Sequence, residues 1–130
     1  MNSAPSLEFA AGQLWRCVGR TTDEQPTVLI NRVDVHPLGG EIFHVTLGDI
    51  HLRNPRLLSG LTTSLPHVPV IRQTLELSGA QFVGLQDPDL VYLEGYAQWK
   101  REFDAGNAGS FGVSIAKVLD FVERGLNGRG

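Results

Sequence analysis

The stretch Glu41-Ile42-Phe43-His44-Val45-Thr46-Leu47 decides the fold. Phe43, Val45 and Leu47 recur at every second position, which is typical of a strand with one face buried in a core. The side chains between them lie on the opposite face, and His44 is one of these. We therefore expect a strand that buries Phe43 on one side and places His44 on the other.

Other stretches around this strand also favour extended structure. Residues 13–20 alternate with a period of two, residues 27–35 are rich in β-branched side chains, and residues 50–53 form a further short stretch after a bulge or bend at Gly48-Asp49. Short turns separate these stretches, which favours an antiparallel meander. Further short strands at 80–85 and 110–113 would give a sheet of about four to six strands.

The second half of the chain has helical periodicity. Pro69 and Gly79 suit the start and the end of one helix. A second helix is predicted over 89–103 by aromatic residues at steps of four, three and four, and a third follows Ser114. Residues 54–66 show no clear period and indicate a loop. Strands followed by helices predict an α+β fold, with about three helices packed on one face of the sheet.

Composition indicates one globular domain. The 130 residues are 42% hydrophobic and 19% charged, so residues 1–130 are expected to form a single domain with frayed ends at 1–12 and 127–130. One cysteine, Cys17, excludes an internal disulfide and any multi-thiolate metal site. No apolar run approaches ~20 residues, and the start lacks signal-peptide features. We expect a cytoplasmic protein with no membrane partner.

Charge and motifs exclude several functions. Eleven Lys and Arg against fourteen Asp and Glu give a net charge of −3 with no basic stripe, so nucleic acid is not an expected partner. The sequence contains no nucleophile elbow and no glycine-rich phosphate loop. We therefore assign no catalytic residue and no cofactor, and a non-enzymatic protein is favoured.

Histidines are the remaining candidates for chemistry. His44 and His51 are seven residues apart, and a bulge at Gly48-Asp49 could bring them together with a carboxylate from Glu41 or Asp49. Such a group would suit metal binding or acid–base chemistry. None of the usual metal-ligand spacings is present, so we expect no bound metal.

The aromatic helix supports two hypotheses for function. If its rings pack on the sheet, the opposite side points outward and forms a binding surface for another protein. The residues of that surface would be Glu94, Gln98, Arg101 and Glu102. The alternative is a small enzyme or a small-ligand-binding protein whose pocket, between sheet and helix, contains His44, Trp15 and Tyr96.

Several segments together resemble a family of small bacterial proteins whose molecular activity is unknown. The segments that carry the resemblance are Gly12-Gln13-Leu14-Trp15-Arg16, Gly40-Glu41-Ile42-Phe43-His44-Val45, Arg53-Asn54-Pro55, Ser64-Leu65-Pro66, Glu94-Gly95-Tyr96-Ala97-Gln98-Trp99-Lys100 and the helix from Ser114 to Glu123. The resemblance implies no catalytic motif. By analogy with small bacterial proteins of this make-up, we expect an immunity-type inhibitor that binds a toxin, plausibly a basic one.

Overall fold

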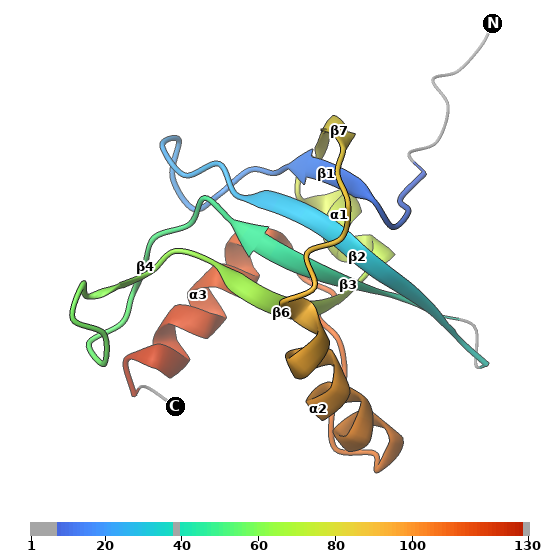
Figure 1. Ribbon diagram of the computed structural model, residues 1–130. Helices are drawn as coiled ribbons and strands as arrows, with labels where there is room; N and C mark the ends of the chain where they lie inside the picture. Colours follow the sequence, from blue (N-terminus) through green and yellow to red (C-terminus); the bar gives the residue numbers. More distant parts are fainter. Residues whose placement is uncertain (1–7, 38–39, 129–130) are drawn as a thin grey trace, which may run out of the picture.

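A five-stranded antiparallel sheet forms the centre of the computed structural model, which describes residues 8–37 and 40–128 (Figure 1). The strand order is β6-β3-β2-β1-β7, and every neighbouring pair is antiparallel. The strands are β1 (Gln13–Arg16), β2 (Thr27–His36), β3 (Gly40–Gly48), β6 (Leu65–Ile71) and β7 (Gln81–Leu85). A separate two-stranded sheet contains β4 (Leu52–Arg53) and β5 (Leu61–Thr62).

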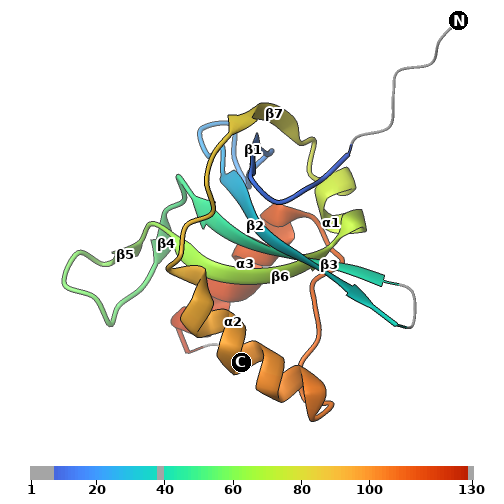
Figure 2. The ribbon, with the colours of Figure 1, turned by 45° about the vertical axis from the view of Figure 1, so that its right-hand side comes forward.

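Three helices pack against the main sheet, as the α+β prediction requires. They are α1 (Arg72–Leu77), α2 (Tyr92–Asp104) and α3 (Ile115–Leu126). They do not all share one face, contrary to the expected arrangement. Phe43 packs in the core with Ile115 of α3, whereas His44, the next residue of β3, contacts Tyr96 of α2. Because neighbouring strand residues point to opposite faces, α2 and α3 cover opposite sides of the sheet (Figure 2).

The core lies between the sheet and α3, where the sequence predicts it. Val118 and Leu119 are fully buried and pack in one cluster with Phe43, Val45 and Leu47. Val122, further along α3, is partly buried and packs against this cluster. Ser114 caps α3, because its side chain accepts a hydrogen bond from the backbone N–H of Lys117.

The largest error of the sequence analysis is the segment from 61 to 71. It contains β5 and β6, whereas residues 54–66 were expected to form a loop and Pro69 to begin a helix. Val68 and Val70 are buried at alternate positions, and Val70 pairs with Phe43. Edge strands tolerate proline, so Pro69 does not exclude pairing with β3. The helix therefore begins only at Arg72.

Two smaller expectations also differ. Phe9, within the start that was expected to be frayed, is buried, and the backbone N–H of Gly12 donates to the carbonyl of Ile30. Residues 110–113 contribute only an isolated bridge between Val70 and Phe111. At the other expected frayed end, the side chain of Asn127 donates to the carbonyl of Arg53. Residues 1–7 and 129–130 of these two ends lie outside the described residues.

Candidate functional site

Helix α2 is fastened to the sheet by a cluster of polar side chains centred on His44. His44 is fully buried in β3, and its Nδ1 atom lies 2.9 Å from Nε2 of His67 in β6. Its Nε2 atom lies 3.1 Å from Oδ2 of Asp34 in β2. The hydroxyl of Tyr96, in α2, donates to the same Oδ2 atom at 2.8 Å. These four residues, the His44 network, join three strands to the helix.

Asp34 is the anion of the His44 network. Burial raises the pKa of Asp34, but hydrogen bonds from Arg32 and Tyr96 outweigh burial and hold that pKa below its ordinary value. Arg32 donates through Nε to Oδ1 of Asp34 at 2.8 Å. An ionised carboxylate only accepts hydrogen bonds, so Nε2 of His44 carries the proton in its bond to Asp34.

The two imidazole rings are neutral at pH 7. Burial lowers the pKa of His44 to about 4, and burial also lowers the pKa of His67. A neutral imidazole has one donor and one acceptor nitrogen. Because Nε2 of His44 donates to Asp34, its Nδ1 accepts from Nε2 of His67. The donors therefore run in one direction, from His67 through His44 to Asp34, and Nδ1 of His67 is left as an acceptor.

Aromatic rings of α2 enclose this network. The centroids of Tyr96 and Trp99 lie 4.7 and 4.8 Å from that of His44, with their planes steeply inclined to it. Trp99 stacks on Phe103 at 4.6 Å, and its indole N–H donates to the carbonyl of Gly109 at 2.8 Å. The aromatic stripe of the sequence, which is Tyr92, Tyr96, Trp99 and Phe103, therefore faces the sheet. This leaves the other side of α2 directed away from it.

A depression of about 470 Å³ lies beside the His44 network, between α2 and residues 32–37. It reaches Asp34 and Tyr96, but neither His44 nor His67 lines it. Its charged groups pair with each other: Arg32 with Asp34, and Lys100 with Asp104, both at 2.8 Å. A ligand in this depression would therefore meet paired charges, aromatic edges and the imidazole of His36, without access to the ring nitrogens of His44.

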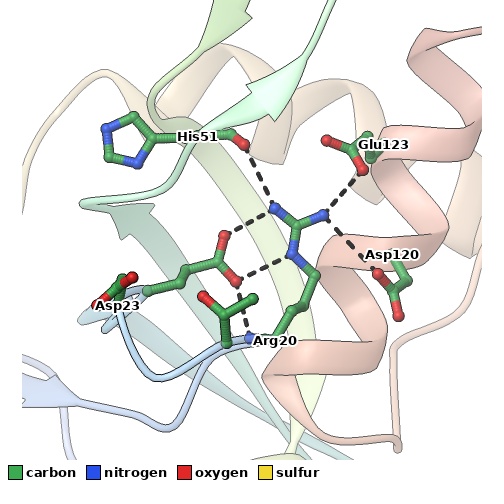
Figure 3. Close-up of a pocket in the computed structure, with 7 residues that line it drawn as sticks. Arg20, Asp23, His51, Asp120 and Glu123 are labelled. Carbon is green, nitrogen blue, oxygen red and sulfur yellow. Dashed lines mark hydrogen bonds and ion pairs between the residues drawn. The ribbon is translucent and has the colours of Figure 1, made fainter.

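A second cavity, of about 460 Å³, is built around Arg20 (Figure 3). The guanidinium of Arg20 bonds both carboxylate oxygens of Glu24, at 2.9 and 2.7 Å, and Oε1 of Glu123 in α3 at 2.9 Å. It also lies 3.7 Å from Asp120 and donates to the carbonyl of His51. Hydrogen bonding to Arg20 lowers the pKa of Glu24, which is nearly buried. This ion-pair cluster ties the 17–26 connection to α3 and to the chain before β4.

The residues expected to bind a partner are all exposed. Glu94, Gln98, Arg101 and Glu102 lie on the side of α2 turned away from the sheet, as helical spacing requires. Exposed apolar side chains adjoin them at the start of the helix. These are Leu90, Val91 and Leu93.

The residues of the expected pocket are only partly brought together. His44 and Tyr96 are in contact, but Trp15 packs with Phe9 and Phe82 on the other face of the sheet. Trp15 stands across from Val28 in the ladder, and Val28 is part of the core beneath α3. A single pocket that contains His44 and Trp15 is therefore excluded by the alternation of β1.

The other candidate side chains also lie apart. His51 is exposed beside Arg20, and His44 pairs with His67 in place of His51. Glu41 forms an ion pair with Arg72 at 2.9 Å. Within residues 8–37 and 40–128, no three or more His, Cys, Asp or Glu side chains are grouped so that they could hold a metal ion. Cys17 is buried, and burial raises the pKa of its thiol to about 12, so it is not an activated nucleophile.

Sequence reasoning missed Asp34 and His67 as partners of His44. Asp34 interrupts the apolar run of β2, which was a usable signal, because a charged residue in a central strand needs a partner on its own face. His67 was missed because a loop followed by a helix was expected in this part of the chain. In β6 it alternates with the buried Val68 and Val70, so it lies on the same face of the sheet as His44.

Comparisons of the chain with protein-family models, with curated proteins and with solved structures found no match. None of the described helices has the length and the apolar character needed to cross a membrane.

Proposed function

We propose that this protein acts by binding another protein through the outer face of α2. We define this outer face as the exposed side chains of Leu90, Val91, Leu93, Glu94, Gln98, Arg101 and Glu102. One observation carries the proposal: the His44 network and the aromatic stripe fix α2 to the sheet, and the opposite side of the same helix combines apolar and charged groups. Apolar anchors surrounded by polar side chains are the usual composition of a protein interface.

Charge indicates the kind of partner. Residues 87–104 contain five acidic side chains and two basic ones, a net charge of −3. Lys100 pairs with Asp104 within the helix, so the acidic groups at the start of α2 dominate the field there. A partner with a basic surface would be attracted by this face. An immunity-type inhibitor of a basic toxin is the specific form of this proposal.

The enzyme alternative has less support. Acid–base chemistry at His44 requires that a substrate reach one of its ring nitrogens, and both are occupied by hydrogen bonds inside a closed cluster. The neighbouring depression is lined by Asp34, Tyr96 and His36 among others, but His44 is not among its lining residues. The hydrogen bonds of His44 to His67 and Asp34 therefore favour a structural role for the histidines, which is to hold α2 on the sheet.

The test compares charge reversal on two faces. In a pull-down from lysate, we expect Glu94→Lys/Glu102→Lys to lose the partner that the wild type captures. Asp23→Lys/Glu76→Lys makes the same change in net charge away from α2 and should retain that partner. Both pairs of residues are exposed, so neither change should unfold the protein. The association rate of the wild type should fall with added salt, and this dependence should weaken in the α2 variant. Equal capture by both variants would overturn the assignment of the outer face.

A further inference from the structure

The hairpin formed by β4 and β5 presents leucines to solvent. It covers residues 52–62 and stands out from the body of the molecule (Figures 1 and 2). Leu58 is fully exposed, Leu57 is 45% exposed, and Leu61, at the start of β5, is 38% exposed. Single exposed leucines are common on protein surfaces, but a contiguous group of them marks an interaction site.

The connection between the two strands is firmly built. The backbone N–H of Asn54 donates to the carbonyl of Gly60 at 2.8 Å, and that of Gly60 to the carbonyl of Leu57 at 3.0 Å. The side chain of Asn54 donates to the hydroxyl of Thr62 at 2.9 Å and accepts from the backbone N–H of Arg56 at 3.1 Å. The leucines are therefore held outward by an ordered turn, so that little further ordering would oppose their binding.

Positive charge lies beside these leucines. Residues 50–75 contain three arginines and no acidic side chain, in a chain whose net charge is −3. Arg56 directly precedes Leu57, and Arg53 pairs with Leu61 in the hairpin. In the described part of the chain, neither Arg53 nor Arg56 has an ion-pair partner within 4 Å. The hairpin is therefore a basic segment of an acidic protein.

Helix α3 adds a third arginine next to the hairpin. Arg124 and Arg53 line one cavity of about 390 Å³, together with Glu123 and Asn127. Among the described residues, Arg124 has no ion-pair partner within 4 Å either. Glu123 is the acidic group of this cavity, and it is already paired with Arg20 at 2.9 Å. Two unpaired guanidinium groups therefore face this cavity and are available to an anion.

We propose that the β4–β5 hairpin attaches the protein to the surface of an anionic membrane. Leu57 and Leu58 enter the boundary between headgroups and acyl chains, and the three arginines bind lipid phosphates. A guanidinium binds phosphate oxygens in a bidentate manner, and basic side chains beside apolar ones are typical of surface attachment to membranes. The expectation of no membrane partner rested on the absence of a long apolar run, which surface attachment does not require.

The shape of the hairpin favours lipid over an acidic protein as the partner. A stable protein interface buries about 800 Å² on each partner and fits a complementary surface. The hairpin instead offers a few leucines on a projecting turn. A lipid surface admits such a turn without a preformed pocket, while its phosphates meet the arginines around it.

The test is co-sedimentation with vesicles of phosphatidylglycerol and phosphatidylcholine in about equal amounts. We expect the wild type to bind these vesicles, and to bind less with added salt or with phosphatidylcholine alone. Leu57→Ser/Leu58→Ser should lower the partition coefficient at least about tenfold, because the apolar contact is lost. Arg56→Gln should lower it about fivefold, because one charge near the surface is lost.

Matched controls make the same changes elsewhere on the surface. Leu77→Ser/Leu85→Ser and Arg101→Gln, at exposed residues outside the hairpin, should leave the partition coefficient unchanged. Circular dichroism and thermal unfolding establish that each variant is folded. The hairpin shares no residue with the outer face of α2, so this test is independent of the proposed function.

Two outcomes would overturn the proposal. One is a wild type that does not bind the anionic vesicles, even if the hairpin captured an acidic protein. The other is vesicle binding that Leu57→Ser/Leu58→Ser and Arg56→Gln both retain in full, since another surface would then contact the lipid.

Discussion

His67 lies so close to Gly95 of α2 that a Cβ atom added at position 95 would stand 2.9 Å from the Cβ of His67. Glycine in a helix interior is unfavourable, by roughly 1 kcal/mol relative to alanine. Here it allows α2 to approach β6 closely enough for Tyr96, the next residue, to reach Asp34. The histidine pair and the helical glycine are therefore one structural feature: the strand supplies the ring and the helix leaves room for it.

This contact predicts opposite effects of the same substitution in two helices. Gly95→Ala should reduce the free energy of unfolding by about 1–3 kcal/mol, because the backbone of β6 cannot move away without breaking the bond between His67 and His44. Gly125→Ala, in α3, meets nothing within 4 Å and should raise stability by about 0.5–1 kcal/mol. Urea unfolding of both variants measures the difference. If Gly95→Ala were as stabilising as Gly125→Ala, this result would contradict the close approach of α2 to His67 in β6.

The core could be predicted from sequence because both of its patterns are local. The period of two in residues 41–47 and the helical spacing after Ser114 each identify one apolar face, and two apolar faces must meet. The same reasoning could not place α2. Its aromatic stripe predicts that it packs on the sheet, but not on which face. That choice depends on His44, Asp34 and His67, which come from three strands.

Val118 provides the test of this predicted core. It is fully buried against the sheet in the cluster that contains Phe43. Val118→Ala should reduce the free energy of unfolding by on the order of 1–3 kcal/mol through lost burial and the cavity left behind. Val113→Ala, at an exposed valine before α3, should change it by less than about 0.5 kcal/mol. Similar losses for the two variants, measured by urea unfolding, would contradict the predicted packing.

The site was harder to predict than the core because its partners depend on which strands pair. The expected bulge at Gly48-Asp49 was meant to join His44 to His51. The partner of His44 instead comes from β6, where His67 alternates with the buried Val68 and therefore lies on the face of His44. A loop followed by a helix was expected at these positions. Spacing along the sequence does not contain this information.

Burial of His44 predicts how stability depends on pH. In the unfolded chain its pKa is the ordinary 6.5, whereas in the folded protein it is about 4. Between these values the unfolded state binds a proton that the folded state does not. The free energy of unfolding should therefore fall as the pH is lowered from about 6.5 to about 4, by on the order of 3 kcal/mol from this residue. Above about pH 6.5, His44 is neutral in both states, so this loss of stability should be absent there.

The measurement is urea unfolding at several pH values for three proteins. His44→Gln should lose much of the pH dependence between 6.5 and 4, because the glutamine has no imidazole to protonate. His51→Gln removes an exposed histidine and should keep the wild-type dependence. A wild type that becomes more stable as the pH falls through this window would show that His44 is charged in the folded protein.

Among single charged groups, we expect removal of the Arg20 guanidinium to have the largest effect on the free energy of unfolding. Its guanidinium is the ion-pair partner of Glu24, whose side chain is only 8% exposed, and it also binds Glu123 of α3. Arg20→Met keeps most of the apolar stem but leaves Glu24 desolvated without its cation, which should reduce the free energy of unfolding by about 2–4 kcal/mol.

The control is Lys100→Met, which breaks the exposed pair with Asp104 and should change the free energy of unfolding by less than about 0.5 kcal/mol. The double variant Arg20→Met/Glu24→Gln should recover part of the loss, because the buried charge is then removed. Equal, small losses for Arg20→Met and Lys100→Met would mean that solvent screens the Arg20 cluster as it screens a surface pair.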